Sequence, residues 1–303
     1  MAFTAADVKN LREMTGVGMM DCKKALTEAE GNMDKAVELL REKGLAASQK
    51  KAGRIAAEGM AYAGVIDGVG AVVEVNAETD FVGKNEKFVD FVKGVAAVVA
   101  KEKPADLDAL MAAPYGNGRT VQEEQQEMVL VIGENIKVRR FAFFTEGVCV
   151  PYIHAGGKIG VLVNLETSLT AEQVNEVGKD VAMQICAMNP TFLDKSDVDQ
   201  ATLDKEKEIL MVQAKEDPKN ASKPENIIEK MVMGRIGKYY EENCLLQQAF
   251  VKENKISVEK HVAEVAKQLG GKITVKAFTR FQTGEGIEKK EDDFAAEVAS
   301  MIK

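Results

Sequence analysis

The sequence predicts an α+β protein with a small helical unit, a duplicated core and a helical insertion. Three observations lead to this prediction. The first fifty residues have the pattern of three short helices, two β-rich segments resemble each other at a fixed offset, and a strongly charged helical stretch interrupts the second repeat. With 303 residues, of which 46% are apolar and 29% charged, the chain is long enough for two or three domains with cores of their own.

Short helices separated by glycines fill the first fifty residues. The expected helices are one that begins after Thr4 and breaks at residues 15–18, one at about residues 20–30, and one at about residues 34–43. Gly44 is expected to end the third helix, and residues 46–57 have the composition of a linker or a short exposed helix. Helices this short bury little apolar surface, so we predict a small binding module.

Two segments of the remaining chain are similar to each other. Residues 73–79 (VEVNAET) resemble residues 161–167 (VLVNLET), at an offset of 161 − 73 = 88 residues. Each copy follows a turn that contains glycine, at Asp67 and Gly68 in the first copy and at residues 155–157 in the second. Two β-hairpins are therefore expected.

Each hairpin is followed by helical sequence and then by a further strand. These strands are expected at residues 136–141 and 273–278, at an offset of 273 − 136 = 137 residues. If both units follow one β-β-α-β plan, 137 − 88 = 49 residues are inserted in the second unit.

The insertion is predicted between about residues 190 and 247, where the sequence is highly charged and weakly prone to form strands. Its apolar residues recur at helical intervals, at Leu203, Ile209, Leu210, Val212, Ile227, Ile228, Met231 and Ile236. Residues 218–224 begin and end with proline and are expected to turn between two antiparallel helices. A projecting hairpin cannot bury its whole apolar stripe against the core, so self-association through this arm is a reasonable hypothesis.

A short helix is expected at the C-terminus. Asp292 or Asp293 can cap it, and Phe294, Val298 and Met301 share one side, which suits docking onto a partner. The predicted division of the chain is residues 1–54 for the helical module, 55–146 for the first core subdomain, 147–190 with 245–281 for the second, 191–244 for the arm and 282–303 for the C-terminal module.

Composition excludes several classes of protein. The apolar runs, such as residues 94–100, are far shorter than the ~18–20 residues that a membrane helix needs. Charged residues at helical spacing near the N-terminus argue against a targeting signal, so we expect a cytoplasmic protein. The net charge of −8 argues against direct nucleic-acid binding. Reduced and mostly buried thiols are expected at the four widely spaced cysteines, Cys22, Cys149, Cys186 and Cys244.

The sequence lacks the patterns of an enzyme or of a cofactor site. Lys158 follows two glycines but lacks the frame of a phosphate-binding loop, and residues 16–18 lack the third glycine of a dinucleotide fingerprint. His261 lies in a helical stretch that favours a packing or surface role, whereas His154 stands at a predicted hairpin turn. We expect no cofactor and no metal, and the alternative of another class is an enzyme with an unrecognised site.

One short segment breaks the local pattern. Residues 76–83 end a strand, yet they place Phe81 between Asp80 and a glycine that can reverse the chain. A buried core phenylalanine is one interpretation. The other is an exposed aromatic ring held at a rigid strand end, as in the hot spot of a protein interface, with the Asp80 carboxylate beside it.

Several segments resemble the elongation factor Ts family. The matching residues are 14–26 (MTGVGMMDCKKAL), 78–82 (ETDFV), 154–163 (HAGGKIGVLV), 248–251 (QAFV) and 284–289 (GEGIEK). The resemblance extends over essentially the whole chain. Departures are small, since Ala249 stands where the family often has proline and the loop at residues 114–119 is longer than usual.

The resemblance implies an architecture and an activity. The N-terminal module should be similar to a ubiquitin-associated domain, the insertion should be a coiled-coil arm for dimerisation, and the final module should be helical. The family's activity is guanine nucleotide exchange on elongation factor Tu. It binds the GDP form of that GTPase and releases GDP by stabilising the nucleotide-free state and dislodging Mg²⁺, without covalent chemistry. An adaptor that binds partners without changing GDP release is the alternative of another class.

The resemblance also assigns site residues. Thr79, Asp80, Phe81 and Val82 should intrude between helices of the GTPase near its Mg²⁺ ion. The other residues expected to contact the GTPase are Val17, Gly18, Met19, Met20, His154, Gly156, Gly157 and Phe294.

Overall fold

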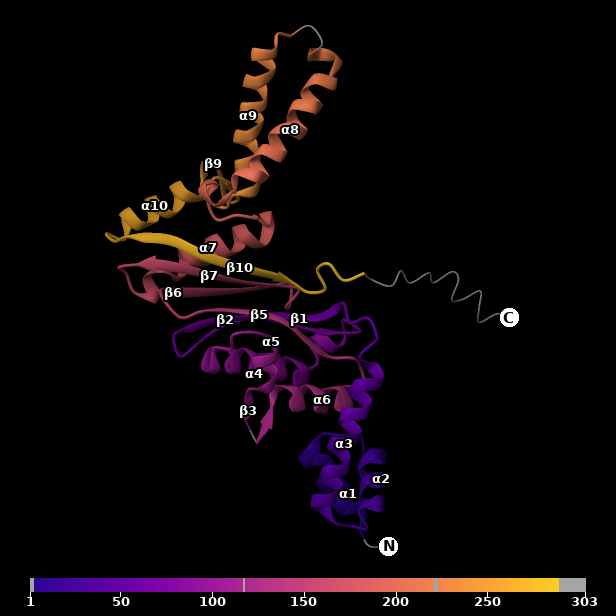
Figure 1. Ribbon diagram of the computed structural model, residues 1–303. Coiled ribbons are helices and arrows are strands. Elements are labelled where there is room, and N and C mark those ends of the chain that lie inside the picture. Colours follow the sequence, from indigo (N-terminus) through magenta and orange to yellow (C-terminus); the bar gives the residue numbers. More distant parts are fainter. Residues whose placement is uncertain (1–2, 117, 221–222, 289–303) are drawn as a thin grey trace.

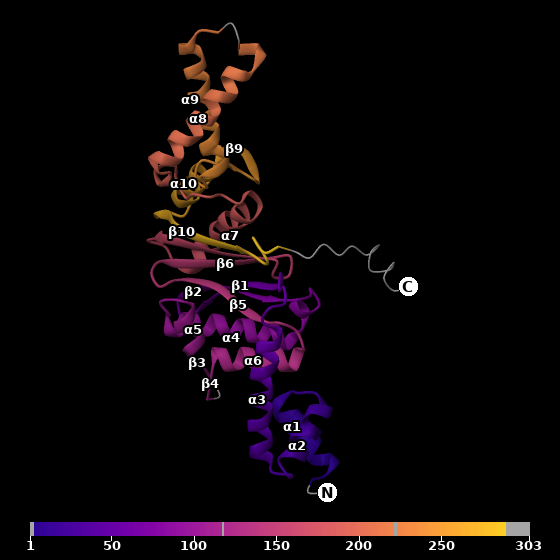
Figure 2. The ribbon, with the colours of Figure 1, turned by 45° about the vertical axis from the view of Figure 1, so that its right-hand side comes forward.

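The computed structural model describes residues 3–116, 118–220 and 223–288, and its mixture of helices and sheets confirms the predicted α+β class. Two three-stranded antiparallel sheets pack against each other at the centre, and helices cover their outer faces (Figure 1). A three-helix unit lies at one end of the molecule and a helical hairpin projects from the other, as Figure 2 also shows.

The three-helix unit forms as the sequence predicts. It contains α1 (Ala5–Thr15), α2 (Met19–Glu28) and α3 (Met33–Lys51). Thr4 caps α1 in a reciprocal pair of hydrogen bonds with Asp7, and Gly16 ends this helix in the left-handed conformation. The core of the unit is small and apolar, and consists mainly of Val8, Leu11, Val17, Cys22, Ala25, Leu26, Ala36 and Leu40.

The expected end of the third helix at Gly44 is wrong. α3 continues to Lys51, so the first half of the expected linker is helical. The second half of α3 packs on α6 (Val121–Ile132), where a Cβ atom on Gly44 would lie 3.4 Å from the carbonyl oxygen of Gln126. That distance is ordinary van der Waals contact, so the packing on α6 is compatible with a continuous helix at Gly44, and tertiary packing outweighs local propensity. One continuous helix therefore joins the three-helix unit to the core (Figure 1).

The first core unit is a sheet covered by helices on one face. Its strands β1 (Glu58–Ile66), β2 (Val69–Ala77) and β5 (Lys137–Phe144) lie in the order β1-β2-β5. The covering helices are α4 (Glu86–Glu102), α5 (Leu107–Ala112) and α6, with a small hairpin of β3 (Pro114–Gly116) and β4 (Arg119–Thr120) beside them. Phe88 and Phe91 of α4 are fully or almost fully buried in the core of this unit.

The second core unit repeats this plan and confirms the predicted duplication. Its strands β6 (Val148–His154), β7 (Ile159–Thr167) and β10 (Ile273–Gln282) lie in the order β10-β7-β6. Its helices are α7 (Ala171–Met188) and α10 (Val258–Gln268), with a small hairpin of β8 (Ala249–Phe250) and β9 (Glu253–Ser257). The two similar segments form the central strands β2 and β7, and each pairs with the third strand of its own unit.

A thin apolar layer, which includes two alanines, lies between the two sheets. Ala61, Ala63, Val72, Leu162 and Phe281 form the apolar layer between them. The sheets also share a backbone hydrogen bond, in which Ala61 N donates to Gly157 O at 2.7 Å. The two units therefore keep separate cores and pack directly against each other through this layer.

A fully buried glutamate ties the end of β10 to the first sheet. Glu74 on β2 accepts hydrogen bonds from Arg139 at 3.0 Å, from Arg140, and from the backbone N of Gly284 at 2.8 Å. Burial alone would raise the pKa of Glu74, but the hydrogen bonds from Gly284, Asn76 and the two arginines outweigh it, so the pKa is lowered. The carboxylate therefore stays ionised in the interior.

The insertion forms a helical hairpin, as predicted. α8 (Gln200–Glu216) and α9 (Glu225–Asn243) pack along each other, and the turn between them begins with a short 3₁₀ helix at Pro218–Asn220. Ala214, Ile228 and Val232 are buried between the helices. Four large apolar side chains of the arm remain exposed, namely Ile209, Val212, Ile227 and Met233.

The expected C-terminal helix, with Phe294, lies in residues 289–303, outside the described residues. Within the described part of the chain, no helix combines the length and the apolar character that crossing a bilayer requires.

Candidate functional site

Phe81 lies on a protruding turn between β2 and α4, residues 78–82, which we call the tip. Its side chain is 79% exposed, so the interpretation of a buried core phenylalanine is wrong. Val82, the next residue, takes the inward position and is buried in the first core. A Cβ atom on Gly83 would lie 2.8 Å from Gly59 O, so the chain passes too close to β1 for any side chain there. These two contacts leave Asp80 and Phe81 on the outside of the turn.

A second carboxylate, Glu134, holds the first half of the tip. Glu134 Oε2 accepts hydrogen bonds from the backbone N of Glu78 at 3.1 Å and of Thr79 at 2.9 Å, and Oε1 accepts from the Thr79 hydroxyl at 2.7 Å. In return, the Glu78 carboxylate accepts from the backbone N of Asn135 at 2.6 Å. This reciprocal arrangement fixes the tip at the point where β2 ends.

Asp80 and Phe81 project together from this fixed tip. Asp80 is exposed, and its carboxylate makes no hydrogen bond or ion pair with any part of the chain that the structure describes. Val82 buries its side chain and so anchors the tip from the other end. Of the four residues predicted here, two therefore face solvent and two, Thr79 and Val82, hold the tip in place.

The three-helix unit lies next to the tip. A groove between them is lined by Gly16, Phe81, Val82, Asn85, Lys87, Val131, Ile132 and Glu134. Met19 and Met20, at the start of α2, are exposed, as are Met14 and Gly18. Val17 is only 1% exposed and packs in the core of the three-helix unit, so its side chain is not available on this surface as expected.

Of the contact residues predicted at the second hairpin, two are exposed and one is buried. His154 and Gly156 are exposed at the turn between β6 and β7, and the Tyr152 hydroxyl lies 3.1 Å from His154 Nδ1. Gly157 is buried. A Cβ atom at this position would lie only 2.5 Å from the side chain of Met60, so the position requires glycine. Its role is to let the two sheets pack closely.

The beginning of β1 connects this turn with the tip. Glu58 pairs with Lys158 of the second hairpin, and Gly59 lies against Gly83, the residue directly after the tip. The two surfaces that the sequence predicts to bind a partner are therefore connected through β1, although they come from different core units.

Comparison with known proteins identifies relatives of this chain. The family model described as "Elongation factor TS" matches residues 78–285. A protein named elongation factor Ts from Syntrophotalea carbinolica is 52% identical over 308 residues, which cover 100% of both chains. Proteins of the same name from Clostridium perfringens (strain SM101 / Type A) and Clostridium kluyveri (strain ATCC 8527) are 53% and 49% identical, and the alignments cover 98% and 99% of both chains.

The chain belongs to the elongation factor Ts family. Its place is therefore among the factors of translation elongation in protein biosynthesis. Residues 78–285 include the whole tip, both hairpin strands of the second unit and the arm, so most of the surface described above lies within the family match.

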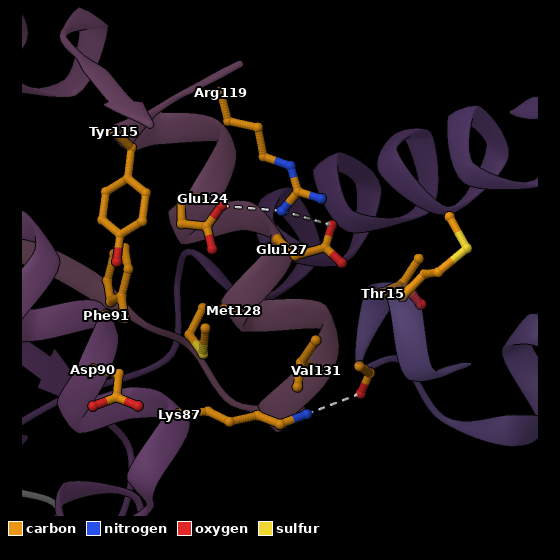
Figure 3. Close-up of a pocket in the computed structure, with 12 residues that line it drawn as sticks. Thr15, Lys87, Asp90, Phe91, Tyr115, Arg119, Glu124, Glu127, Met128 and Val131 are labelled. Atoms are coloured by element: carbon orange, nitrogen blue, oxygen red, sulfur yellow. Dashed lines mark hydrogen bonds and ion pairs between the residues drawn. The ribbon is translucent and has the colours of Figure 1, made fainter. Parts of the chain in front are cut away.

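A cavity of about 350 Å³ separates α1 from α4 and α6 in this family member (Figure 3). Lys87 extends across it, and its Nζ donates to the carbonyl oxygen of Gly16 at 3.4 Å. At the opposite side, Arg119 pairs with Glu124 at 3.0 Å and with Glu127 at 4.0 Å. Burial raises the pKa of Glu127, although the charge of Arg119 opposes this shift. These contacts attach the three-helix unit and the small hairpin to the core.

The thiols have the character that the sequence predicts. All four cysteines are free, and three of them are buried. Burial raises the pKa of each, to about 11 for Cys244. Among the described residues, no group of three or more His, Cys, Asp or Glu side chains could hold a metal ion.

Sequence reasoning missed Glu134 and Asn135. The only local signal is an acid directly after Gly133, the glycine that ends α6 in the left-handed conformation. Their partners at Glu78 and Thr79 are more than fifty residues away in the sequence. A contact at that separation depends on how α6 packs, which a single sequence does not reveal.

Proposed function

We propose that this chain binds the GDP form of elongation factor Tu and accelerates the release of GDP. The observation that carries the proposal is the exposed Phe81 ring beside the exposed Asp80 carboxylate, on a tip held at both ends. An aromatic side chain that is held rigidly in solvent contributes nothing to its own core, and such residues are typical anchors of protein interfaces.

The proposed mechanism is thermodynamic linkage and involves no covalent step. A factor that binds the nucleotide-free GTPase more tightly than the GDP-bound form must weaken GDP binding by the same factor, because the cycle of binding steps closes. The chain therefore acts as an exchange factor and not as an enzyme that transforms a substrate.

The tip supplies the difference in affinity between the two states. Phe81 acts as a wedge between helices of the GTPase, and Asp80 places a carboxylate near the Mg²⁺ ion that bridges nucleotide and protein. Mg²⁺ requires near-octahedral coordination at about 2.0–2.1 Å, so a small displacement of its ligands weakens the whole site. Thr79 and Val82 keep the wedge in position.

The remaining surfaces hold the GTPase in place. We assign this role to Gly18, Met19 and Met20 of the three-helix unit, which we propose to be similar to a ubiquitin-associated domain. His154 and Gly156 contact a different domain of the GTPase, and the C-terminal module with Phe294 adds a further contact.

The arm is proposed to be a coiled-coil element for dimerisation. Its exposed apolar residues, among them Ile209 and Val212, have no partner within the described chain that would cover them. The predicted division into residues 1–54, 55–146, 147–190 with 245–281, 191–244 and 282–303 is kept as the working set of modules.

Stopped-flow measurement of GDP release tests the proposal. Purified elongation factor Tu is loaded with fluorescent GDP in the presence of Mg²⁺ and mixed with the chain and an excess of unlabelled GDP. We expect the release rate to rise with the concentration of the chain and to saturate. Binding without any change in the release rate would instead identify an adaptor, and it would reject the exchange activity.

A further inference from the structure

Residues 133–135, directly after α6, bind two parts of the molecule at once. The carbonyl oxygen of Gly133 accepts a hydrogen bond from Lys51 at the end of α3. The Asn135 side chain donates to the carbonyl oxygen of Arg54 at 2.7 Å, and its backbone N donates to Glu78. The same short segment therefore holds the helix that carries the three-helix unit and the strand end that carries Phe81.

We propose that Glu134 is a positioning residue, which sets the direction of the Phe81 ring and the Asp80 carboxylate without touching the partner protein. The inference deepens the exchange function proposed above and rests on it. The three bonds of Glu134 to Glu78 and Thr79 end one residue before Asp80.

The chemistry at this point requires an acceptor with several free lone pairs. Two backbone N–H groups and one hydroxyl converge on the place where β2 has ended at Ala77, so the strand ladder supplies no partner for them. A carboxylate has about four acceptor positions and no donor, and its charge strengthens each bond. Glu134 satisfies all three donors with one side chain.

The two ends of the tip are held by different means. Val82 and Gly83 fix the far end through burial and through the close approach to Gly59. At the near end, Glu78 is also held through its carboxylate by the backbone N of Asn135, whereas Thr79 is held by Glu134. Removal of the Glu134 carboxylate therefore frees Thr79 and Asp80 while leaving Glu78 and the far end attached. The Phe81 ring then samples several directions, and the cost of ordering it is added within the complex, at the step in which the ring enters the GTPase and GDP is released.

A set of variants separates positioning from simple stabilisation. Glu134→Ala removes all three bonds. Glu134→Gln is the conservative rescue, because its amide oxygen can accept from both backbone N–H groups while its NH₂ donates to the Thr79 hydroxyl. Glu176→Ala is the matched control, because Glu176 is an exposed glutamate on α7 in the other core unit.

The readout is the stimulated release of fluorescent GDP from elongation factor Tu, measured over a range of concentrations. We expect Glu134→Ala to lower the maximal rate about tenfold, as the loss of charge-assisted hydrogen bonds implies, and to change the half-saturating concentration less. Glu134→Gln should keep most of the rate, and Glu176→Ala all of it. A maximal rate for Glu134→Ala equal to that of the unmodified chain would overturn the proposal.

A double variant tests whether Glu134 acts through Phe81. In a chain that already carries Phe81→Ala, Glu134→Ala should cause a much smaller fold-loss of rate, because only the Asp80 carboxylate is left to position. An equal fold-loss in both backgrounds would mean that Glu134 only stabilises the fold, and it would overturn the positioning role. Should Glu134→Ala fail to fold, Thr79→Val, which is nearly isosteric and removes one of the three bonds, takes its place.

Hydrogen exchange of the isolated chain distinguishes failure of this inference from failure of the exchange function. Glu134→Ala should speed exchange of the Glu78 and Thr79 amides at least about tenfold, whether or not the chain acts on any GTPase. Unchanged protection of these amides would overturn the inference. If protection falls as expected but the unmodified chain does not accelerate GDP release, the exchange function fails and the positioning role fails with it.

Discussion

Substitution of Phe81 by alanine is the perturbation for which the structure gives the clearest magnitude. A phenylalanine side chain presents roughly 150–250 Å² to its surroundings. Because the residue is 79% exposed, about 160 Å² is available for burial by a partner. At ~25 cal/mol per Å² this area contributes at most about 4 kcal/mol to the complex.

The lower limit comes from interface anchors in general, whose truncation to alanine costs about 2 kcal/mol or more. We therefore expect Phe81→Ala to reduce the second-order rate of stimulated GDP release about 30- to 700-fold, at about 1.4 kcal/mol per factor of ten. The free energy of unfolding should change by less than about 0.5 kcal/mol, because the ring packs against so little of its own chain.

The assay is stopped-flow release of fluorescent GDP, combined with thermal unfolding of the variant. Val251→Ala, an exposed apolar side chain in the turn between β8 and β9, is the matched control and should keep the full rate. A Phe81→Ala variant that releases GDP as fast as the unmodified chain would refute the wedge. A variant that unfolds at a markedly lower temperature would refute the claim that the ring is free of the core.

Three further predictions concern the pH response, the backbone and the arm. Glu74 has a lowered pKa in the folded chain, so its contribution to stability is present above its unfolded pKa and is lost as the pH falls through the folded pKa. Melting temperatures should therefore fall less steeply with acid in Glu74→Gln than in the unmodified chain. Equal slopes for the two proteins would contradict this. Gly44→Ala should be tolerated or raise the free energy of unfolding by up to about 1 kcal/mol, since the position is helical and a Cβ atom has room. Gly59→Ala should destabilise strongly, because the residue has φ +117°. Denaturant titration of both variants checks the contrast, and similar midpoints would count against it. Val212→Asp on the exposed face of α8 should shift any dimer towards monomer in light scattering, and an unchanged mass at all concentrations would argue against the arm as the dimer contact.

Much of the fold could be predicted because its signals are local. The hairpin turns at Gly68 and Gly156 are set by residues that tolerate positive φ, and the copy of residues 73–79 at 161–167 predicts the same strand in both units. The arm was predictable because its charge and helical spacing differ from those of the strands around it.

The exposure of Phe81 could not be decided from the sequence. Either side of the turn could have faced the core, and the outcome depends on Gly83 against Gly59 and on Glu134, all of which are tertiary contacts. The same reason explains the continuation of α3 through Gly44. A glycine that ends a helix and a glycine inside a helix that packs on a neighbour look alike until the neighbour is known.

The burial of Val17 shows a related limit. Its place within a matched family segment suggested a contact, but the structure places its side chain in the core of the three-helix unit. A motif contains both the residues that meet a partner and the residues that shape the surface, and only packing separates them.

The central claim is that the tip favours the empty GTPase over the loaded one. Its most direct test is the dissociation constant of the chain for elongation factor Tu, measured once without nucleotide and once at saturating GDP and Mg²⁺. The account predicts tighter binding to the empty form, by the same factor by which the chain weakens GDP binding. Equal dissociation constants for the two forms would contradict it.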